Sequence, residues 1–487
     1  MAAVLKNYIG GAWIEGSGTT RNVNPSNTDD IVGEYARADK VQAASAVTAA
    51  KEAFASWSVS TPQVRYDALA KISADILARK EEFGRLLARE EGKTLPEAVG
   101  EVARAGQIFA FFAGEALRLT GEKVASVRPG IDVEMTREPL GVVALITPWN
   151  FPIAIPAWKI ASALCYGNTV VFKPADLVPG SGHALTEIIA KSGIPAGVFN
   201  LVMGSGSVVG QTFLEHPEVV AVSFTGSVST GRRIAQACVG GDRMKKFQLE
   251  MGGKNPQVVL DDADLKVAVE AAVNGAYFST GQRCTAASRF IVTEGIHDRF
   301  VAALTERLEG LVVDDALKAG VQIGPVVDQN QLDQDLRYIE VGKGEGAKLH
   351  WGGALLKRET AGFYLQPALF TEASNSMRIS REEIFGPVAS VIPFDGEPDA
   401  IKIANDTPYG LAGAVWTRDI YKAFRVVKSL RAGVIWVNHM QPTYVEAPWG
   451  GYKQSGFGRE LGPWGLEEYL ETKQVFVNLD ETPIGWY

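Results

Sequence analysis

The stretch Leu140-Gly-Val-Val-Ala-Leu-Ile-Thr-Pro-Trp-Asn-Phe-Pro152 is an apolar run that ends in a polar, proline-rich tip. Its segment Val142–Ile146 predicts a strand buried on both faces, because a strand with one wet face would alternate apolar and polar residues. No charge occurs between Leu140 and Trp158, about the length of a membrane helix, but three prolines interrupt the run. We therefore expect a buried strand, a loop and a helix rather than a membrane span.

A regular alternation of strands and helices continues outward from this run. The next predicted strands are Thr169–Phe172, Phe199–Met203, Val219–Phe224 and Phe247–Glu250, with helical segments between them. Strands that alternate with helices indicate an α/β fold with a parallel, doubly wound, Rossmann-like sheet. Ligands of such sheets bind at the carboxyl ends of the strands.

Polar or glycine-rich tips follow each of the five strands, at residues 147–152, 173–176, 204–210, 224–231 and 250–253. Glycine lets backbone approach a phosphate group, and the following helix N-terminus favours its negative charge. Each tip alone is equally typical of an ordinary turn, as Lys173 alone is of a solvated surface lysine. Their succession at one edge of the sheet favours a cofactor-binding cleft.

The two ends of the chain predict packing elements. Residues 7–35 suggest a small hairpin or edge strands, and the helical patterns that follow are Val41–Ser56, Gln63–Glu91 and Leu95–Leu119. Asp132–Arg137 alternates as an exposed arm does. Tyr469–Val477 is a terminal strand that needs an edge to join, which another subunit could supply.

Size and composition limit the class of protein. With 487 residues, 46% hydrophobic and 21% charged, the chain suggests a globular protein of two or three domains. The net charge of −8 argues against nucleic acid or an anionic membrane as partner, and favours a small molecule. Three scattered cysteines and five separated histidines predict no disulfide framework and no metal site. The first residues lack a secretory pattern, so we expect a reducing, cytoplasmic location.

Residues 278–289, Phe-Ser-Thr-Gly-Gln-Arg-Cys-Thr-Ala-Ala-Ser-Arg, set Cys284 among small polar residues and beside Arg283. A free thiol titrates near ~8.5, and neighbouring cations or backbone N–H groups raise the fraction of thiolate. This pattern predicts a nucleophile. The alternative is a small buried hydrophobe, the commoner role of a free cysteine.

Seven short motifs follow one another along the chain. They are Pro148-Trp-Asn-Phe-Pro152, Lys173-Pro-Ala175, Phe224-Thr-Gly-Ser227 with Gly231, Glu250-Met-Gly-Gly-Lys254, Gly281-Gln-Arg-Cys284, Glu383-Ile-Phe-Gly-Pro387 and Pro448-Trp-Gly-Gly451. With these motifs the chain resembles the aldehyde dehydrogenase superfamily over essentially its full length. The resemblance implies a cofactor-binding domain (1–119 and 140–251), an α/β catalytic domain (252–463) and a small β oligomerisation domain (120–139 and 464–487), assembled as a homodimer or homotetramer.

The resemblance also implies the chemistry, an NAD(P)-dependent oxidation of an aldehyde to its acid through a cysteine thiohemiacetal and a thioester. It assigns catalytic positions to Cys284, Glu250, Asn150 and Lys173. Cys284 is the nucleophile, the Asn150 amide and the Cys284 N–H hold the oxyanion, and Glu250 activates water. One alternative is a related enzyme that passes the thioester to coenzyme A instead of water, and Glu250 argues against it. The other is a catalytically silent relative, against which the presence of Cys284, Glu250, Asn150 and Lys173 argues.

The same resemblance implies the binding residues. Cofactor contacts are expected from Ile146, Thr147, Pro148, Trp149, Lys173, Ala175, Asp176, Gly206, Gly210, Phe224, Thr225, Gly226, Ser227, Met251, Gly252, Glu383 and Phe385. Asp176 stands where many relatives have glutamate, which leaves NAD and NADP both open; its carboxylate favours NAD because it repels a 2′-phosphate. The substrate tunnel is expected from Phe151, Ile155, Trp158, Arg283, Thr285, Tyr444 and Trp449.

Three features of the sequence bear on the identity of the aldehyde. Gly-Gln-Arg-Cys-Thr, with Arg283 before the nucleophile, resembles members that oxidise anionic semialdehydes such as 2-oxoglutarate (2,5-dioxopentanoate) or succinate semialdehyde, because a guanidinium pairs with a carboxylate. The segment around Glu446–Lys453 resembles betaine aldehyde dehydrogenases, whose substrate is a cation. The aromatic side chains of the tunnel would also admit a benzaldehyde-like or vanillin-like substrate.

Overall fold

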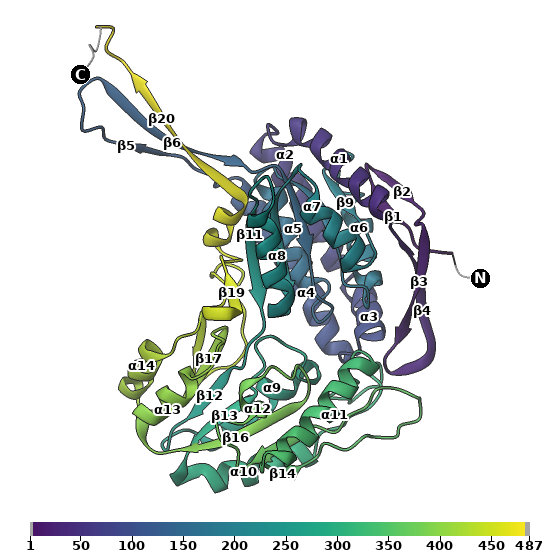
Figure 1. Cartoon of the computed structure of the whole chain (residues 1–487), viewed down its shortest axis with the longest axis vertical. Helices are drawn as coiled ribbons and strands as arrows, with labels where there is room; N and C mark the ends of the chain where they lie inside the picture. The colour runs from purple at the N-terminus through teal and green to yellow at the C-terminus, as the bar shows by residue number, and fades with distance from the viewer. Residues whose placement is uncertain (1–2, 483–487) are drawn as a thin grey trace.

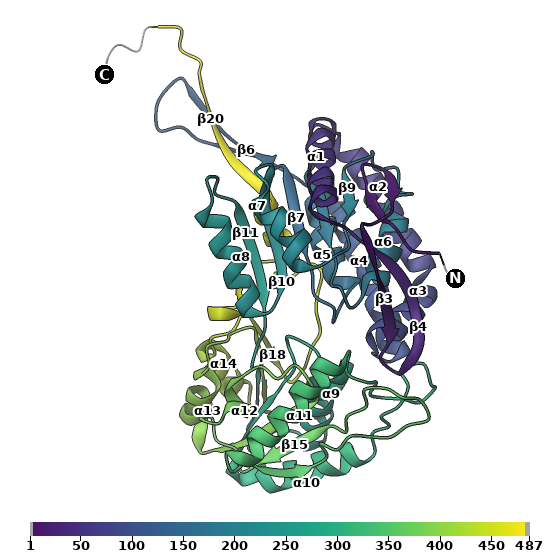
Figure 2. The same ribbon diagram turned by 45° about the vertical axis from the view of Figure 1, so that its right-hand side comes forward.

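The computed structural model describes residues 3–482 and has two lobes with a projecting arm (Figure 1). The upper lobe in that view holds the first sheet, the lower lobe holds the second, and the arm is a narrow three-stranded sheet that leaves the body in both views (Figure 2). Residues 1–2 and 483–487, the outer ends of the predicted segments 1–119 and 464–487, lie outside the described residues.

The first sheet is built around five parallel strands, β7 (Val142–Ile146), β8 (Thr169–Lys173), β9 (Phe199–Leu201), β10 (Val219–Gly226) and β11 (Lys246–Met251). Their spatial order is β11-β10-β7-β8-β9, so the chain adds strands on one side of β7 and then on the other. The predicted doubly wound sheet is confirmed. The direction of winding changes between β7 and β10, which is where ligands of such sheets bind.

Strand β7 is buried on both faces, as its continuous apolar sequence predicts. Val143 and Leu145 belong to the core under one face, whereas Val142 and Ala144 belong to the core under the other. The first core is closed by α2 (Pro62–Ala78), α4 (Leu95–Ala116), α5 (Ala154–Cys165) and α6 (Pro179–Ile189), and the second by α1 (Lys40–Trp57), α7 (Gln211–Glu215) and α8 (Val228–Gly240).

The predicted single helix over Gln63–Glu91 is wrong, since two helices occupy that range. Helix α2 ends at Ala78 and α3 (Lys80–Glu91) begins after Arg79, whose φ of −108° and ψ of 16° leave the helical region. No glycine or proline marks the break, and the apolar residues keep their helical spacing across it, so periodicity alone could not reveal it. The sequence Thr61-Pro62 is typical of a helix start, and the Thr61 side chain caps α2 by accepting a hydrogen bond from Val64 N.

The second sheet is also mainly parallel and supports the lower lobe. Its order is β14-β15-β16-β13-β12-β17-β18, with only β14 antiparallel. The strands are β12 (Pro256–Val259), β13 (Arg289–Thr293), β14 (Lys348–Trp351), β15 (Ala368–Thr371), β16 (Val388–Phe394), β17 (Ala412–Trp416) and β18 (Val434–Val437). Its helices are α9 (Leu265–Tyr277), α10 (Glu294–Glu309), α11 (Gln329–Gly344), α12 (Arg378–Arg381), α13 (Gly396–Asn405) and α14 (Ile420–Ser429).

The arm consists of β20 (Leu470–Asn478), β6 (Ile131–Pro139) and β5 (Glu122–Val124), all antiparallel. The terminal strand β20 therefore pairs along one edge with β6 of its own chain, with Leu470 opposite Pro139 and Asn478 opposite Ile131. Its other edge pairs with nothing within residues 3–482. The expectation that this strand joins another subunit can apply only to that second edge.

Short strands complete the fold. The hairpin β1 (Asn7–Ile9) and β2 (Ala12–Ile14) extends one edge of the first sheet, β19 (Gly456–Phe457) extends the other, and β3 (Gly18–Asn24) pairs with β4 (Asn27–Arg37). The expected N-terminal hairpin and edge strands are thus present. No helix in the described chain has both the length and the apolar composition needed to cross a membrane.

Candidate active site

A cavity of about 560 Å³ lies where the two lobes meet, at the carboxyl ends of the strands of the first sheet. Helices α4 and α5 and the ends of β10 and β11 contribute one side; the segments around Cys284 and residues 439–443 contribute the other. Its lining includes Cys284, Glu250, Phe151, Ile155, Trp158, Thr225, Met251, Arg283, Thr285 and Trp449. Most of the chemistry-bearing residues predicted from distant motifs therefore face one space.

Cys284 follows a tight turn after helix α9. Ser279 and Thr280 adopt left-handed φ values of 50° and 58°, an uncommon conformation that needs support from the surroundings. Ser279 N donates to Glu97 Oε1 (2.8 Å), and Asn255 Nδ2 donates to the carbonyl oxygen of Cys284 (2.8 Å). These bonds fix the backbone on both sides of the thiol.

The surroundings of Cys284 keep its thiol protonated. Burial raises the pKa of Cys284 to about 12, and the nearby Glu250 adds to this, while Arg283 acts in the opposite direction. The expectation that the adjacent arginine would enrich the thiolate is not met, because the loss of solvent outweighs one cation. A base must take the thiol proton when the nucleophile attacks.

Asn150 lies in the loop that follows β7, buried beside the Cys284 loop. Its Nδ2 donates to the carbonyl oxygen of Gln282 (2.9 Å), and its own carbonyl oxygen accepts from Lys93 Nζ (2.6 Å). The side-chain amide is thus aimed toward the loop that carries the thiol, as an oxyanion donor must be.

Lys93 and Glu101 form a buried ion pair under this loop that the motif analysis missed. Lys93 Nζ lies 2.7 Å from Glu101 Oε2, and Glu101 Oε1 accepts from the backbone N–H groups of residues 153 and 154. The ammonium group also lies 3.9 Å from the centre of the Phe151 ring. The pair holds the loop between β7 and α5 at Asn150 and at the start of α5.

Glu250 ends β11 and is only 3% exposed, with its Oε1 lacking a hydrogen-bond partner. Burial and the neighbouring Glu460 raise its pKa well above the usual range, and Lys159 acts against them. Lys159 Nζ contacts Glu460 Oε1 (2.6 Å) and Ser223 Oγ (2.8 Å). None of the sequence motifs includes this pair, although Lys159 is a lone charge inside the otherwise apolar helix α5.

On the other side of β7 lie the predicted cofactor residues Lys173, Asp176, Gly206 and Gly210. Lys173 Nζ contacts Asp176 Oδ1 (3.2 Å) and the carbonyl oxygen of Pro174 (2.8 Å). A Cβ atom on Gly210 would lie 3.9 Å from Ile146 and 4.0 Å from Lys173, whereas one on Gly206 would meet nothing within 4 Å. The glycine loop therefore leaves free space beside Lys173, as a nucleotide requires.

Glu383 and Phe385 form the opposite end of the predicted cofactor site. Glu383 Oε1 accepts from Gly253 N (3.0 Å), and a Cβ atom on Gly252 would lie 1.9 Å from the other carboxylate oxygen. The Phe385 ring packs edge-on against Trp149, with centroids 5.4 Å apart. Only glycine at position 252 lets the Glu383 carboxylate occupy this place. The residues present fit a dinucleotide, from Lys173 to Glu383.

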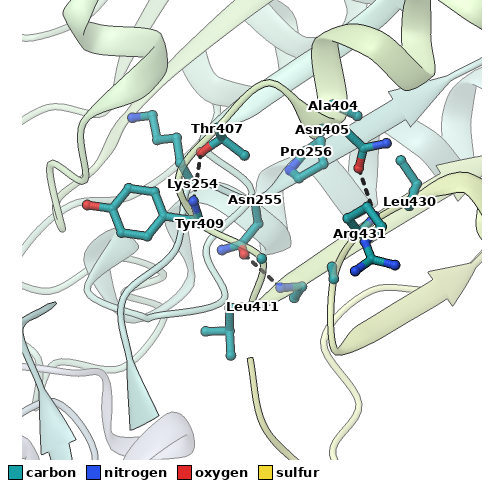
Figure 3. A pocket seen from close by; sticks show the side chains of 14 residues that line it. Lys254, Asn255, Pro256, Ala404, Asn405, Thr407, Tyr409, Leu411, Leu430 and Arg431 are labelled. Atoms are coloured by element: carbon teal, nitrogen blue, oxygen red, sulfur yellow. Dashed lines mark hydrogen bonds between the residues drawn. The ribbon is translucent and has the colours of Figure 1, made fainter. Parts of the chain in front are cut away.

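Lys254 lies directly behind Glu383. It lines a small internal pocket together with Asn255 and Tyr409 (Figure 3), and its Nζ is buried without a hydrogen-bond partner. Burial, with the charge of Arg289, lowers the pKa of Lys254 to about 7, and burial raises the pKa of Glu383 to about 7. The charge of Glu383 opposes the lowering of the Lys254 pKa, and the charge of Lys254 opposes the raising of the Glu383 pKa.

Comparison with known proteins gives one answer over the whole chain. The model of the aldehyde dehydrogenase family matches residues 13–475. The chain belongs to this family. It is 45% identical over 478 residues to the alpha-ketoglutaric semialdehyde dehydrogenase of Bacillus subtilis, covering 97% of both chains, and 41% identical over 488 residues to the betaine aldehyde dehydrogenase of the same organism, covering 99% of both.

A solved structure agrees in fold as well as in sequence. The betaine aldehyde dehydrogenase of Staphylococcus aureus in complex with NAD+ superposes with a TM-score of 0.97 at 39% identity, covering 100% of this chain and 97% of that one. The protein is therefore an aldehyde dehydrogenase, an enzyme that oxidises aldehydes.

The remaining predicted cofactor residues of this aldehyde dehydrogenase lie along the ends of β7, β8, β10 and β11. Thr147 and Pro148 follow β7, Ala175 follows β8, and Phe224, Thr225 and Gly226 end β10. Ser227 caps α8 by accepting a hydrogen bond from Thr230 N (3.3 Å). Thr225 and Met251 face the cavity that contains Cys284.

The predicted substrate residues of the dehydrogenase face the cavity with one exception. Tyr444 is 54% exposed and does not line it; the preceding residues 439–443 do. The loop reaches the cavity earlier because Gln441, with φ of 70°, turns its side chain to Thr285, donating to the Thr285 carbonyl oxygen (2.7 Å) and accepting from the Thr285 hydroxyl. Among residues 3–482, no group of three or more His, Cys, Asp or Glu side chains could hold a metal ion.

Proposed function

We propose that this dehydrogenase oxidises an anionic semialdehyde to its acid, with 2-oxoglutarate or succinate semialdehyde as the preferred type of substrate and NAD as the preferred acceptor. The observation that carries the substrate class is the guanidinium of Arg283. It lies in the wall of the Cys284 cavity and forms no ion pair with any described residue. A carboxylate on the substrate would supply the missing counter-charge.

Arg283 is held in place without being neutralised. Its Nη2 donates to the carbonyl oxygen of Asn274 (2.8 Å), and its guanidinium stacks on the Phe278 ring at 4.5 Å. Its Nε is buried and has no partner. Burial lowers the pKa of Arg283 only to about 10, so the group stays charged at neutral pH. Burying a fixed cation without a counter-ion costs free energy, and an anion that pairs with the cation offsets this cost.

The chemistry follows from three side chains. The Cys284 sulfur bonds to the aldehyde carbon while its proton passes to a base, and the carbonyl oxygen, now an anion, takes hydrogen bonds from Asn150 Nδ2 and the Cys284 N–H. When bound, NAD supplies the acceptor for the hydride that the adduct loses. Glu250 then removes a proton from water as the water oxygen attacks the thioester, which releases the acid and restores the thiol.

The raised pKa of Glu250 suits this role. Burial and the charge of Glu460 raise the pKa of Glu250 above its usual range, so its carboxylate is a stronger base toward water than that of an exposed glutamate. Lys159 and Glu460 act on Glu250 through their charges, and Lys159 Nζ is held by hydrogen bonds to Ser223 and Gln248. Hydrolysis, rather than acyl transfer to coenzyme A, is the function that this arrangement favours.

The preference for NAD rests on Asp176 beside Lys173. The carboxylate lies 3.2 Å from the ammonium group, at the place where a ribose is expected, and a 2′-phosphate there would meet a like charge. The solved relative from Staphylococcus aureus carries NAD+.

A betaine-like or aromatic aldehyde is the second candidate. The rings of Trp158 and Trp449 meet at 61° with centroids 5.7 Å apart in the cavity wall, and Phe151 and Phe278 add further ring surface. Such walls attract a quaternary ammonium group or an aromatic ring. The relatives named betaine aldehyde dehydrogenase favour this candidate too.

One comparison tests the choice. The ratio of kcat/KM for 2-oxoglutarate semialdehyde to that for pentanal is measured with NAD and with NADP. We expect this ratio to be well above ten, and the rate to be higher with NAD than with NADP. The ratio should fall in Arg283→Gln. A ratio near one, with betaine aldehyde or benzaldehyde as the better substrate, would overturn the anionic class.

We also propose that the enzyme self-associates as a dimer or tetramer through the arm. The second edge of β20 is unpaired within the described chain, and Phe476, Val477 and Leu479 are 64%, 41% and 63% exposed. An open strand edge with exposed apolar side chains invites pairing with another chain.

A further inference from the structure

A second guanidinium, that of Arg104, shares the cavity with Arg283. Arg104 lies in helix α4, is partly buried and lines the same space as Cys284. Its Nη1 donates to the carbonyl oxygen of Thr443, and it forms no ion pair among residues 3–482. The cavity therefore contains two cations that protein carbonyls orient but no protein carboxylate neutralises.

The two cations lie at different depths. Helix α4 presents Glu97, Glu101 and Arg104 to the cavity, and Glu97 is bonded to the turn that precedes Cys284. With a rise of 1.5 Å per residue, Arg104 lies about 10 Å further along the helix than Glu97. Arg104 thus faces the outer part of the cavity, next to Thr443, while Arg283 adjoins the thiol.

Two of the acidic side chains that face the cavity, Glu97 and Glu101, already bind groups of the protein. Glu97 accepts from the N–H groups of Thr94 and Ser279, and Glu101 is paired with Lys93. Glu250 retains its proton to higher pH because burial and Glu460 raise its pKa. Arg104 and Arg283 line this cavity without an ion-pair partner among residues 3–482, so both can pair with a carboxylate of a ligand.

We propose that Arg104 is a specificity-determining residue that binds the carboxylate of a longer ω-oxo acid. This rests on the proposed oxidation of an anionic semialdehyde. With the aldehyde carbon at Cys284, a short chain places its carboxylate near Arg283, whereas a chain of five carbons with a 2-oxo acid end extends toward Arg104. The second cation selects 2-oxoglutarate semialdehyde over succinate semialdehyde.

The test uses the full-length enzyme, its Arg104→Gln, Arg104→Lys and Arg283→Gln variants, and three aldehydes: 2-oxoglutarate semialdehyde, succinate semialdehyde and pentanal. We expect Arg104→Gln to lower the kcat/KM ratio of the five-carbon acid to pentanal at least tenfold, mainly through KM. The ratio of succinate semialdehyde to pentanal should fall by less than threefold. Arg104→Lys should recover part of the loss because it keeps the charge.

Each other outcome has a defined meaning. An equal loss for all three aldehydes would assign Arg104 to holding the Thr443 loop and overturn the inference. If only Arg283→Gln lowers the anionic ratios, Arg104 is not the anchor but the proposed function stands. If neither variant changes them, the anionic class itself fails. Should Arg104→Gln not fold, competitive inhibition by glutarate compared between wild type and Arg104→Lys decides, since an unchanged inhibition constant would overturn the inference.

Discussion

Asn150 Nδ2 donates a hydrogen bond of 2.9 Å to the carbonyl oxygen of Gln282, two residues before Cys284. The amide that is to stabilise the oxyanion is therefore tied to the nucleophile loop before any substrate is present. The Lys93 ammonium holds the other side of Asn150 through its carbonyl oxygen. Because both bonds are buried, the donor is positioned before the reaction and little reorganisation is needed.

Replacing Asn150 by alanine tests this donor. We expect kcat to fall about 10²-fold to 10³-fold, the usual effect of losing one oxyanion donor. Steady-state rates with a saturating aldehyde measure it, and cofactor binding by fluorescence serves as the control for folding. A kcat within threefold of wild type, with the cofactor still bound, would remove Asn150 from the oxyanion hole.

Glu250→Gln separates the two halves of the reaction. Oxidation of the Cys284 adduct does not need this carboxylate, but hydrolysis does, so we expect a burst of reduced cofactor close to one per active site followed by slow turnover. Stopped-flow absorbance at the reduced-nicotinamide band records both phases. Cys284→Ser is the matched control and should give no burst; full steady-state activity of Glu250→Gln would contradict the assigned role.

The Lys159–Glu460 pair should set the pH dependence. Activity requires Glu250 without its proton, so rates rise with pH through the raised pKa of Glu250. Lys159 lowers that pKa and Glu460 raises it, so Lys159→Met should move the rise to higher pH and Glu460→Gln to lower pH. Both variants break a buried ion pair, which costs about 3–5 kcal/mol of unfolding free energy.

The measurement is the pH profile of kcat from pH 6 to 10 for each folded variant. Shifts of the same sign in the two variants would show that the pair does not act on Glu250 through its charges. A double variant that removes both charges should lose less stability than either single one, because no buried charge then stands alone.

Stability should fall as pH rises from about 4.5 to 8. Burial raises the pKa of Glu91 to about 8, with Lys93 acting against the shift. The native state therefore keeps a proton that the unfolded chain has released in this window, and the free energy of unfolding decreases with pH. Glu91→Gln does not titrate, so the decrease should be smaller than in wild type in thermal or urea unfolding.

Glu82→Gln is the control for this prediction. Its carboxyl group lies on the surface, where a hydrogen bond from Arg79 lowers the pKa of Glu82 below the ordinary value, so it titrates below the window. The free energy of unfolding of Glu82→Gln should change with pH between 5 and 8 as that of the wild type does. Parallel curves for Glu91→Gln as well would show that Glu91 is ionised in the native protein.

Phe476→Asp tests self-association through the arm. The side chain is 64% exposed in the single chain, so a charge there should leave the subunit folded but repel an apolar partner surface. We expect light scattering to give the subunit mass for this variant and a multiple of it for wild type. Gln474→Asp, on the same face of β20 by the two-residue period, should weaken the assembly as well; an unchanged oligomer of both variants would rule out that face.

Local sequence was sufficient for the parallel sheet and for several helix ends. The continuous apolar segment Val142–Ile146 has no polar face, so it can only lie between two layers, and Thr61 followed by proline fixes the start of α2. The break at Arg79 was not predictable in the same way, because the two helices it separates have no glycine or proline between them and share one apolar spacing.

By itself the sequence determined which segments form the strands of the parallel sheet, where α2 begins, and which motifs carry Cys284, Glu250 and Asn150. These features follow from burial patterns and backbone preferences, which are local. Only the tertiary structure decided which distant groups meet: Lys159 pairs with Glu460 across 301 residues, and Arg104 reaches Thr443 across 339. Such contacts depend on the path of the whole chain. The pKa values of the buried groups depend on it as well, since the loss of water around each one is set by every layer packed against it.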